Sequence, residues 1–356
     1  MASVMTEAHR CYYLHQYEQA LSLLCSYRPV NLDTEIDKRI LEAKANYCLC
    51  RRGTSYSKLA ELIKGFGCNE QTARICSLIV RLFPWHPKSI DLAEWSVRLA
   101  HEMPESHAAY ITALVYNHRV ELAIKHFDRF NQFLEPYEKH YCEIIINSAL
   151  GEHFRTVQKS RTLFTYPFEP IDLFRIIHHF TTGLYYQFHG DADKAVESAI
   201  ALIEEVRPLT LIDKARSYVA FARLYFYAGN IPKSIEYIKL AINVGLEQHP
   251  YLWWALGWLN FRCRKDIPTA TAALEKFLLL LSQYEGVYDI FEEGWHELCK
   301  VHSLTALCIL YIIRLRIFNS VKYMIRLFRE IKNLNKYERE WKVYFQRCGF
   351  LDFERP

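Results

Sequence analysis

The sequence predicts an all-helical fold, an α-solenoid built from stacked helical hairpins. The first observation is a repeat: between residues 176 and 283, small and aromatic residues recur at near-constant offsets around a turn signal. The interval is about 34 residues or slightly more, the period of a helix–turn–helix repeat. Because one hairpin cannot bury its apolar face alone, such repeats stack into a solenoid. The two clearest copies are Gly183, Tyr186, Gly190, Ala195, Ala199 and Ala222, Tyr225, Gly229, Ser234, Ala241.

Composition is the second observation. Hydrophobic residues make up 51% of the 356 residues and aromatic residues 15%, so the chain can bury a large core and we do not expect disorder. There are only 12 Gly and 12 Pro, few for this length, which favours helices with short connections. The net charge of +4 is too small to indicate nucleic-acid binding on its own.

The third observation concerns the cellular compartment. Eleven cysteines are scattered along the chain without a Cys-x-x-Cys pair, and an odd, widely spaced set is not typical of a disulfide scaffold. The N-terminus lacks a basic start followed by an apolar stretch. The longest apolar runs are well below the roughly 20 residues of a membrane helix. We therefore expect reduced thiols, no transmembrane segment and a soluble cytoplasmic protein.

The best-defined hairpin spans residues 215–246. Its first helix, ARSYVAFARLYFYAG, places aromatic and small residues on one face at offsets of three and four. Gly229 and Asn230 predict the end of this helix, because both residues tolerate a left-handed backbone. Pro232 then predicts the start of the second helix, since its missing N–H is not needed in a first helical turn.

This hairpin resembles a tetratricopeptide repeat. The family's order of large, small and aromatic residues appears as Tyr218, Phe221, Ala222, Tyr225, Gly229, Ser234, Ile238 and Ala241. The neighbouring units match through Gly183, Tyr186, Gly190, Ala195, Ala199 and Pro208, and through Trp253, Leu256, Gly257, Ala270 and Leu274. The resemblance is specific over roughly a third of the chain. It implies a right-handed solenoid that binds a protein segment in its concave groove.

The N-terminal half shows weaker copies of the repeat. One begins near Cys11 and another near Pro104, and the rest of this half is helical by pattern. The Pro167–Pro170 stretch is the expected boundary between an irregular and a regular half. The predicted regions are an irregular helical half over 1–166, regular repeats over 171–283 and a C-terminal helical cap over 287–356.

The C-terminal region differs from the repeats. Trp295–Arg316 predicts an apolar helix and Val321–Phe345 an amphipathic one, without the small-residue pattern. We expect this pair to cover the last apolar face of the solenoid. Alternatively, the basic side of the second helix binds nucleic acid, an anionic membrane or an acidic partner. This basic-helix set is Lys322, Arg326, Arg329, Lys336 and Arg339.

No residue pattern indicates catalysis. The sequence contains neither Gly-x-Ser-x-Gly nor a Gly-rich phosphate loop. His296, Cys299 and His302 are spaced three apart, but the two histidines point about 240° apart around a helix, so ordinary packing is favoured over a shared metal ion. We therefore expect a non-enzymatic protein with no metal and no cofactor.

The resemblance also places a candidate peptide-binding groove. Family offsets within the first helix of each repeat select two arginines beside a row of aromatic residues, a set suited to a peptide with acidic and apolar side chains. Part of the aromatic row could instead be core between repeats. The groove residues are Phe180, Gln187, Arg216, Arg223, Phe226, Tyr251, Trp254, Trp258 and Phe261.

Two functions follow from these observations. The first is an interaction module, as an adaptor, a regulator or a secretion-type chaperone, which holds a protein segment in the groove; self-association is also open. The second is a nucleic-acid-associated regulator that uses the basic helix while the solenoid acts as a sensor, but no helix-turn-helix reader is recognisable. A chaperone-tail clamp is disfavoured, because its positions hold Phe180, Leu184, Ala220, Tyr251 and Ala255.

Overall fold

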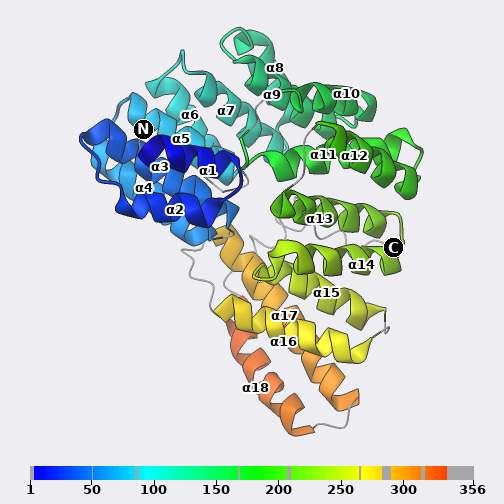
Figure 1. The fold of residues 1–356 in the computed structure, drawn as a ribbon. Helices are drawn as coiled ribbons and strands as arrows, with labels where there is room; N and C mark the ends of the chain where they lie inside the picture. Colours follow the sequence, from blue (N-terminus) through cyan, green and yellow to red (C-terminus); the bar gives the residue numbers. More distant parts are fainter. Residues whose placement is uncertain are drawn as a thin grey trace. The chain divides into compact units, whose positions relative to one another are not determined.

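The computed structural model describes residues 4–49, 51–84, 86, 88–166, 169–206, 210–263, 266–282, 290–313 and 317–334. Every regular element in these residues is a helix (Figure 1). Successive helices pair as hairpins, and within each compact unit neighbouring hairpins stack on one another. The predicted all-helical α-solenoid is confirmed.

The described residues divide into two compact units, one up to Thr210 and the other from Leu211 onward. The helices of the first unit pair in chain order as α1 (Val4–Tyr13) with α2 (Tyr17–Ser26), α3 (Leu32–Cys48) with α4 (Arg52–Phe66), α5 (Glu70–Leu82) with α6 (Ser89–Leu99), α7 (Pro104–Tyr116) with α8 (Val120–Phe130), α9 (Pro136–Ala149) with α10 (His153–Leu163), and α11 (Leu173–Gln187) with α12 (Ala192–Val206).

The second unit continues the same pattern. Its helices pair as α13 (Leu211–Tyr227) with α14 (Ile231–Ala241), α15 (Pro250–Arg262) with α16 (Ile267–Ser282), and α17 (Ile290–Ile313) with α18 (Ile317–Leu334). A π-helical turn, η1 (Ile242–Leu246), extends α14. The hairpin expected over 215–246 is therefore present as α13 and α14.

Several hairpins share one kind of turn between their two helices. A residue in the left-handed conformation follows the first helix, and the next N–H donates to the carbonyl five residues back at 2.8–2.9 Å. This bond satisfies a carbonyl that the helix end would leave unpaired. Glycine adopts the conformation freely, and histidine is among the residues enriched there. The left-handed residues are His15, His118, Gly151, His189 and Gly229.

Helix starts follow equally local rules. The side chain of Asn31 accepts from the Thr34 N–H, and that of Asn69 accepts from the Thr72 N–H, which satisfies donors at the starts of α3 and α5. Asn230 caps α14 in the same way. The helices α7, α9 and α15 instead begin at a proline, where the missing N–H is harmless.

Two glycines lie where helices cross closely. A Cβ on Gly183 of α11 would come within 2.9 Å of Val157 and 3.2 Å of the His153 carbonyl on α10. A Cβ on Gly257 of α15 would come within 2.6 Å of Leu274 Cγ on α16. Small residues at these positions therefore set the helix separation, as the repeat pattern predicts.

The units divide after Thr210. The boundary predicted at Pro167–Pro170 stays a prediction, since part of that stretch lies outside the described residues. Glu169 within it contacts the first hairpins. Its carboxylate pairs with Lys44 at 2.9 Å and accepts from the Tyr12 and Tyr13 hydroxyls at 3.2 Å each. Glu169 is therefore held against helices of the first two hairpins.

The last hairpin packs through one side of α18. Ser320 Oγ donates to the Cys308 carbonyl at 3.1 Å, and Lys300 pairs with Glu330 at 2.8 Å, both between α17 and α18. Apolar side chains remain exposed elsewhere on α18, so this helix does not bury the whole apolar surface of the hairpin. They are Val321, Met324, Ile325 and Phe328. The predicted continuation of this helix to Phe345 lies outside the described residues.

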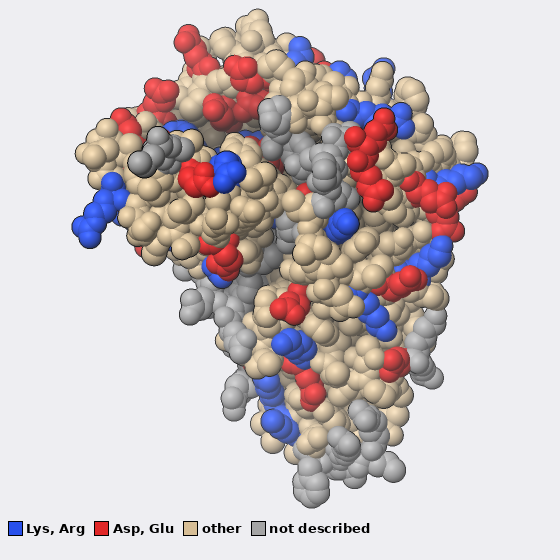
Figure 2. Space-filling model, in the orientation of Figure 1, with Lys and Arg blue, Asp and Glu red and all other residues tan. Residues whose placement is uncertain are grey.

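Surface charge is mixed over the face in Figure 2, where Lys and Arg are interspersed with Asp and Glu among the coloured residues. Within the described part of the chain, no helix has the length and hydropathy needed to span a bilayer.

Candidate functional site

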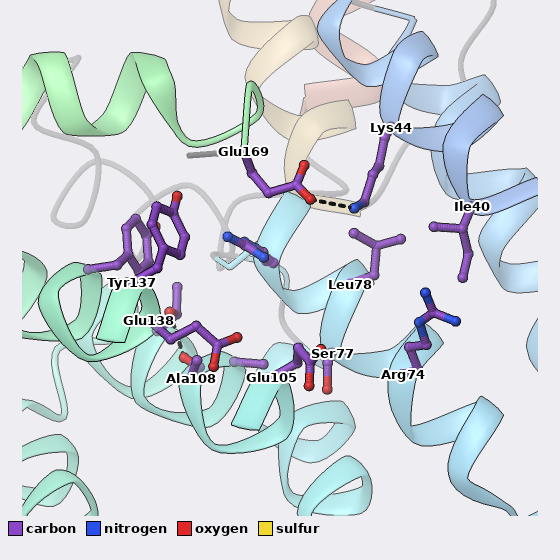
Figure 3. Close-up of a pocket in the computed structure, with 14 residues that line it drawn as sticks. Ile40, Lys44, Arg74, Ser77, Leu78, Glu105, Ala108, Tyr137, Glu138 and Glu169 are labelled. Atoms are coloured by element: carbon purple, nitrogen blue, oxygen red, sulfur yellow. Dashed lines mark hydrogen bonds and ion pairs between the residues drawn. The ribbon is translucent and has the colours of Figure 1, made fainter. Parts of the chain in front are cut away.

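A cavity of about 200 Å³ with charged and apolar lining lies in the first unit (Figure 3). It is lined by the first helices of four successive hairpins, α3, α5, α7 and α9, together with Glu169 ahead of α11. On each helix the lining residues recur at offsets of three and four, so that each helix presents one stripe. They are Ile40, Lys44, Arg74, Ser77, Leu78, Arg81, Glu105, Ala108, Ala109, Thr112, Tyr137, Glu138, Tyr141 and Glu169. We call this cavity the first-unit pocket.

A buried ionic network adjoins the pocket through Arg81 and Tyr137, which line it. Asp172 is fully buried and pairs with Arg81 of α5. The Tyr137 hydroxyl of α9 donates to the same carboxylate at 2.7 Å. Arg175 of α11 donates to the Leu82 carbonyl at 2.9 Å, at the end of α5. The network connects α5, α9 and α11. Removing one partner of the buried pair would leave an uncompensated charge, which is strongly destabilising.

The Lys44–Glu169 ion pair lies at the top of the view in Figure 3. Burial alone would raise the pKa of Glu169, but the nearby charges of Lys44 and Arg81 lower it to about 2. Glu169 is therefore ionised at neutral pH and holds Lys44 in place.

Two carboxylates from helix starts lie in the lower part of the same view. Glu105 follows Pro104 at the start of α7 and is exposed, whereas Glu138 is in the first turn of α9 and only 8% exposed. A carboxylate in a first helical turn interacts favourably with the helix dipole. The Oε2 atom of Glu138 is buried and has no hydrogen-bond partner among the described residues.

The electrostatic state of Glu138 follows from this burial. Burial raises its pKa to about 7, with Glu105 adding to the rise and Arg81 opposing it. The folded-state pKa is above the ordinary value of 4.5, so ionisation costs folding free energy as pH rises from about 4.5 to about 7. A cationic group placed against Oε2 would offset that cost.

The predicted groove residues are divided between the two units. Phe180 and Gln187 are on α11 of the first unit, whereas the other seven are on α13 and α15 of the second. Phe180 is fully buried and packs edge-on against Phe164, 5.7 Å between ring centroids. Trp254 is 2% exposed. Phe180 and Trp254 are therefore core residues and not lining residues.

The remaining second-unit residues form a partly exposed aromatic row. The Trp258 ring stacks on Trp254 at 6.3 Å, on His302 of α17 at 5.1 Å, and lies 5.7 Å from Phe261. Arg223 donates to the Tyr227 hydroxyl at 3.1 Å. Arg216, Arg223, Phe226, Tyr251, Trp258 and Phe261 are all half-buried.

Only two members of the predicted basic helix can be placed. Lys322 is exposed and Arg326 is half-buried on α18, while the side chain of Arg329 and all of Lys336 and Arg339 lie outside the described residues. The His296 side chain also lies outside them. Among the side chains that are described, no group of three His, Cys, Asp or Glu is placed to hold a metal ion.

The comparisons with known proteins bear on the fold. No protein-family model and no curated protein sequence matches the chain. The structure is similar to that of the human IFIT1 dimer with PPP-AAAA, with a TM-score of 0.53 at 15% identity over 90% of this chain and 81% of that one. The fold is of the tetratricopeptide type.

Two other structures show weaker similarity. A chain of the APC/C hetero-tetramer Cut9-Hcn1 matches with a TM-score of 0.48 at 10% identity over 78% of this chain. The chain covers 52% of that protein, about half its length. Rap protein complexed with Competence and Sporulation Factor matches with a TM-score of 0.46 at 13% identity, over 94% of this chain and 98% of that one.

The tetratricopeptide-type repeats of the first unit hold the pocket that sequence reasoning missed. Repeat matching was strongest after residue 176, and the weaker copies near Cys11 and Pro104 were not used to place groove positions on the helices of the first unit. One signal was available. Arg81 and Arg175 interrupt otherwise apolar helical faces, and a charge at a core position indicates a buried partner.

Proposed function

We propose that this chain is a non-enzymatic protein–protein interaction module that holds a segment of a partner in the first-unit pocket. The observation that carries the proposal is the shared lining, in which four successive repeats each contribute a stripe of side chains to one cavity. A peptide that crosses these helices meets a new stripe at every repeat. Mixed charged and apolar lining, held by a buried network, suits the recognition of a specific segment.

The second unit offers a second candidate surface for the same function. Its half-buried set on α13 and α15 combines Arg216 and Arg223 with a row of aromatic rings, the residue types that dominate protein interfaces. An adaptor or regulator could use both units at once, since two linked binding sites raise the effective affinity.

Nucleic-acid binding through the basic C-terminal helix is the alternative from another class. Lys322 and Arg326 are the described residues that would carry it. Phosphate contacts make affinity fall steeply with salt, whereas a pocket with apolar walls is much less sensitive. Salt dependence therefore separates the two classes directly.

Selection of random dodecapeptides displayed on phage against the full chain tests the proposal. The selected peptides are then measured by fluorescence anisotropy on three variants. Ala108→Phe fills the pocket, and Arg74→Glu reverses a charge at the pocket mouth. Arg223→Ala combined with Trp258→Ala removes two side chains of the second-unit set. We expect Ala108→Phe to weaken binding about thirtyfold or more, as for loss of a central interface residue, and the second-unit variant to bind like wild type.

Circular dichroism melting of each variant separates loss of binding from loss of folding. Arg74 is 48% exposed, so its substitution leaves the core intact. Reversing the charge there should change the affinity of a charged peptide several-fold, strengthening a basic peptide and weakening an acidic one. If only the second-unit variant binds the selected peptides more weakly, the binding site is on α13 and α15. Selective binding of a labelled RNA dodecamer with a steep salt dependence would favour the basic helix instead.

A further inference from the structure

We propose that the first-unit pocket accepts a lysine or arginine side chain of the bound segment, with its charged end between Glu138 and Glu105. This inference rests on the proposed function, because it names the part of the partner that the pocket recognises. It is carried by the pairing of charges around the cavity, by the buried oxygen of Glu138 and by the apolar wall.

Every cation that lines the pocket already has a carboxylate partner. Lys44 pairs with Glu169 at 2.9 Å, Arg81 pairs with the buried Asp172, and Arg74 pairs with Asp37 at 3.1 Å. An acidic ligand would therefore have to displace an existing partner. The pocket is not organised to receive an anion.

The two carboxylates at the helix starts are in the opposite situation. Glu138 Oε2 is buried without a hydrogen-bond partner in the described part of the chain, and Glu105 forms no ion pair there. A buried carboxylate oxygen without a partner is costly, and a charged donor supplied by a ligand removes that cost. The site therefore lacks one cationic group at Glu138 Oε2.

Apolar side chains that line the same cavity suit the stem of a basic side chain. Ile40, Leu78, Ala108 and Ala109 line the same cavity and contribute apolar surface. Lysine and arginine bury their methylene groups along apolar surface while the charged end reaches polar groups. A cation on a flexible apolar stem matches both parts of the lining, whereas a small hydrated ion would match only the carboxylates.

The ionisation of Glu138 gives the site a pH dependence. The charged groups that act on this carboxyl are Arg81 of α5, Glu105 of α7 and Glu135 at the start of α9, and burial raises its pKa to about 7. Only the ionised form attracts a cation. Affinity for a basic peptide should therefore fall roughly tenfold as pH is lowered from about 8 to about 6.

Four peptide libraries test the inference on the full chain. Each is acetylated and amidated, random at three positions on both sides, and fixed at the centre as lysine, arginine, norleucine or glutamate. We expect the lysine or the arginine library to bind, and the better of the two identifies the side chain. Norleucine keeps the stem without the charge, so it should bind about tenfold or more weakly, as for loss of a charge-assisted hydrogen bond.

Substitutions on the protein complete the test. Glu138→Gln should weaken the basic peptide about tenfold or more, abolish its pH dependence and leave the norleucine peptide unaffected. Glu105→Gln, at an exposed position, should give a smaller loss without any effect on folding. Glu121→Gln on α8 is the matched control, because Glu121 is exposed and does not line the pocket.

The possible failures are distinguishable. Equal binding of the lysine, norleucine and glutamate libraries, all abolished by Ala108→Phe, would overturn this inference and leave the proposed function standing. Binding that Ala108→Phe does not change would overturn the proposed function itself. Basic peptides that bind equally well to Glu138→Gln and Glu105→Gln would also overturn the inference.

Discussion

Replacing Asp172 by alanine should lower the free energy of unfolding of the first unit by about 3–5 kcal/mol. Asp172 is completely buried and compensates the charge of Arg81. Its removal would leave that guanidinium without its carboxylate and the Tyr137 hydroxyl without its acceptor. Urea unfolding of the full chain, followed by far-UV circular dichroism, measures the loss.

The matched control is Arg74→Ala, which removes an ion pair with Asp37 at the surface. Both side chains of that pair are more than one-third exposed, 48% and 43%, so we expect a change of about 1 kcal/mol or less. Equal effects of the two substitutions would contradict the buried network. Asp172→Asn preserves the shape and should give an intermediate loss, because it keeps an acceptor but not the charge.

Replacing Trp254 by alanine should destabilise the second unit by about 3–5 kcal/mol, the range for removal of a large buried ring. Trp254 is 2% exposed and its ring is stacked on Trp258. The cavity left behind lies within the second unit, whose helices cannot fully close it. Thermal unfolding by circular dichroism measures the effect.

Trp253→Ala is the control on the same helix. Trp253 is half-buried and donates one hydrogen bond from Nε1 to the Glu247 carbonyl at 2.7 Å. Its loss should cost about 1 kcal/mol. An unchanged melting curve for Trp254→Ala together with lost peptide binding would show that Trp254 lines the peptide-binding groove, as the sequence predicted.

Local signals predicted the fold well because they are read within one helix or one turn. The small residues Gly183 and Gly257 indicate close helix crossings, and both occupy them. Gly229 predicts a helix end and adopts the left-handed conformation there, with φ of 74°. Proline signals were reliable at helix starts, since Pro104, Pro136 and Pro250 each begin a helix.

The pocket could not be predicted in the same way. Arg81 and Asp172 are 91 residues apart, so their pairing depends on how α5 and α11 pack and not on any local pattern. Glu138 has an ordinary place in a first helical turn, where a solvated charge is the usual interpretation. Its burial arises from packing that one helix cannot reveal. Groove positions carried over from the family likewise named Phe180 and Trp254, whose burial depends on neighbouring helices.

Photo-crosslinking from the pocket tests the central claim most directly. A benzoylphenylalanine at Arg74, at the mouth of the pocket, should crosslink the peptide selected on the full chain. The same group at Phe154, which is exposed on α10 and does not line the pocket, should not. A crosslink from Arg74 alone is the predicted result. A peptide that crosslinks from Phe154, or from Trp258 in the second unit, but not from Arg74 would contradict a binding site in the first-unit pocket.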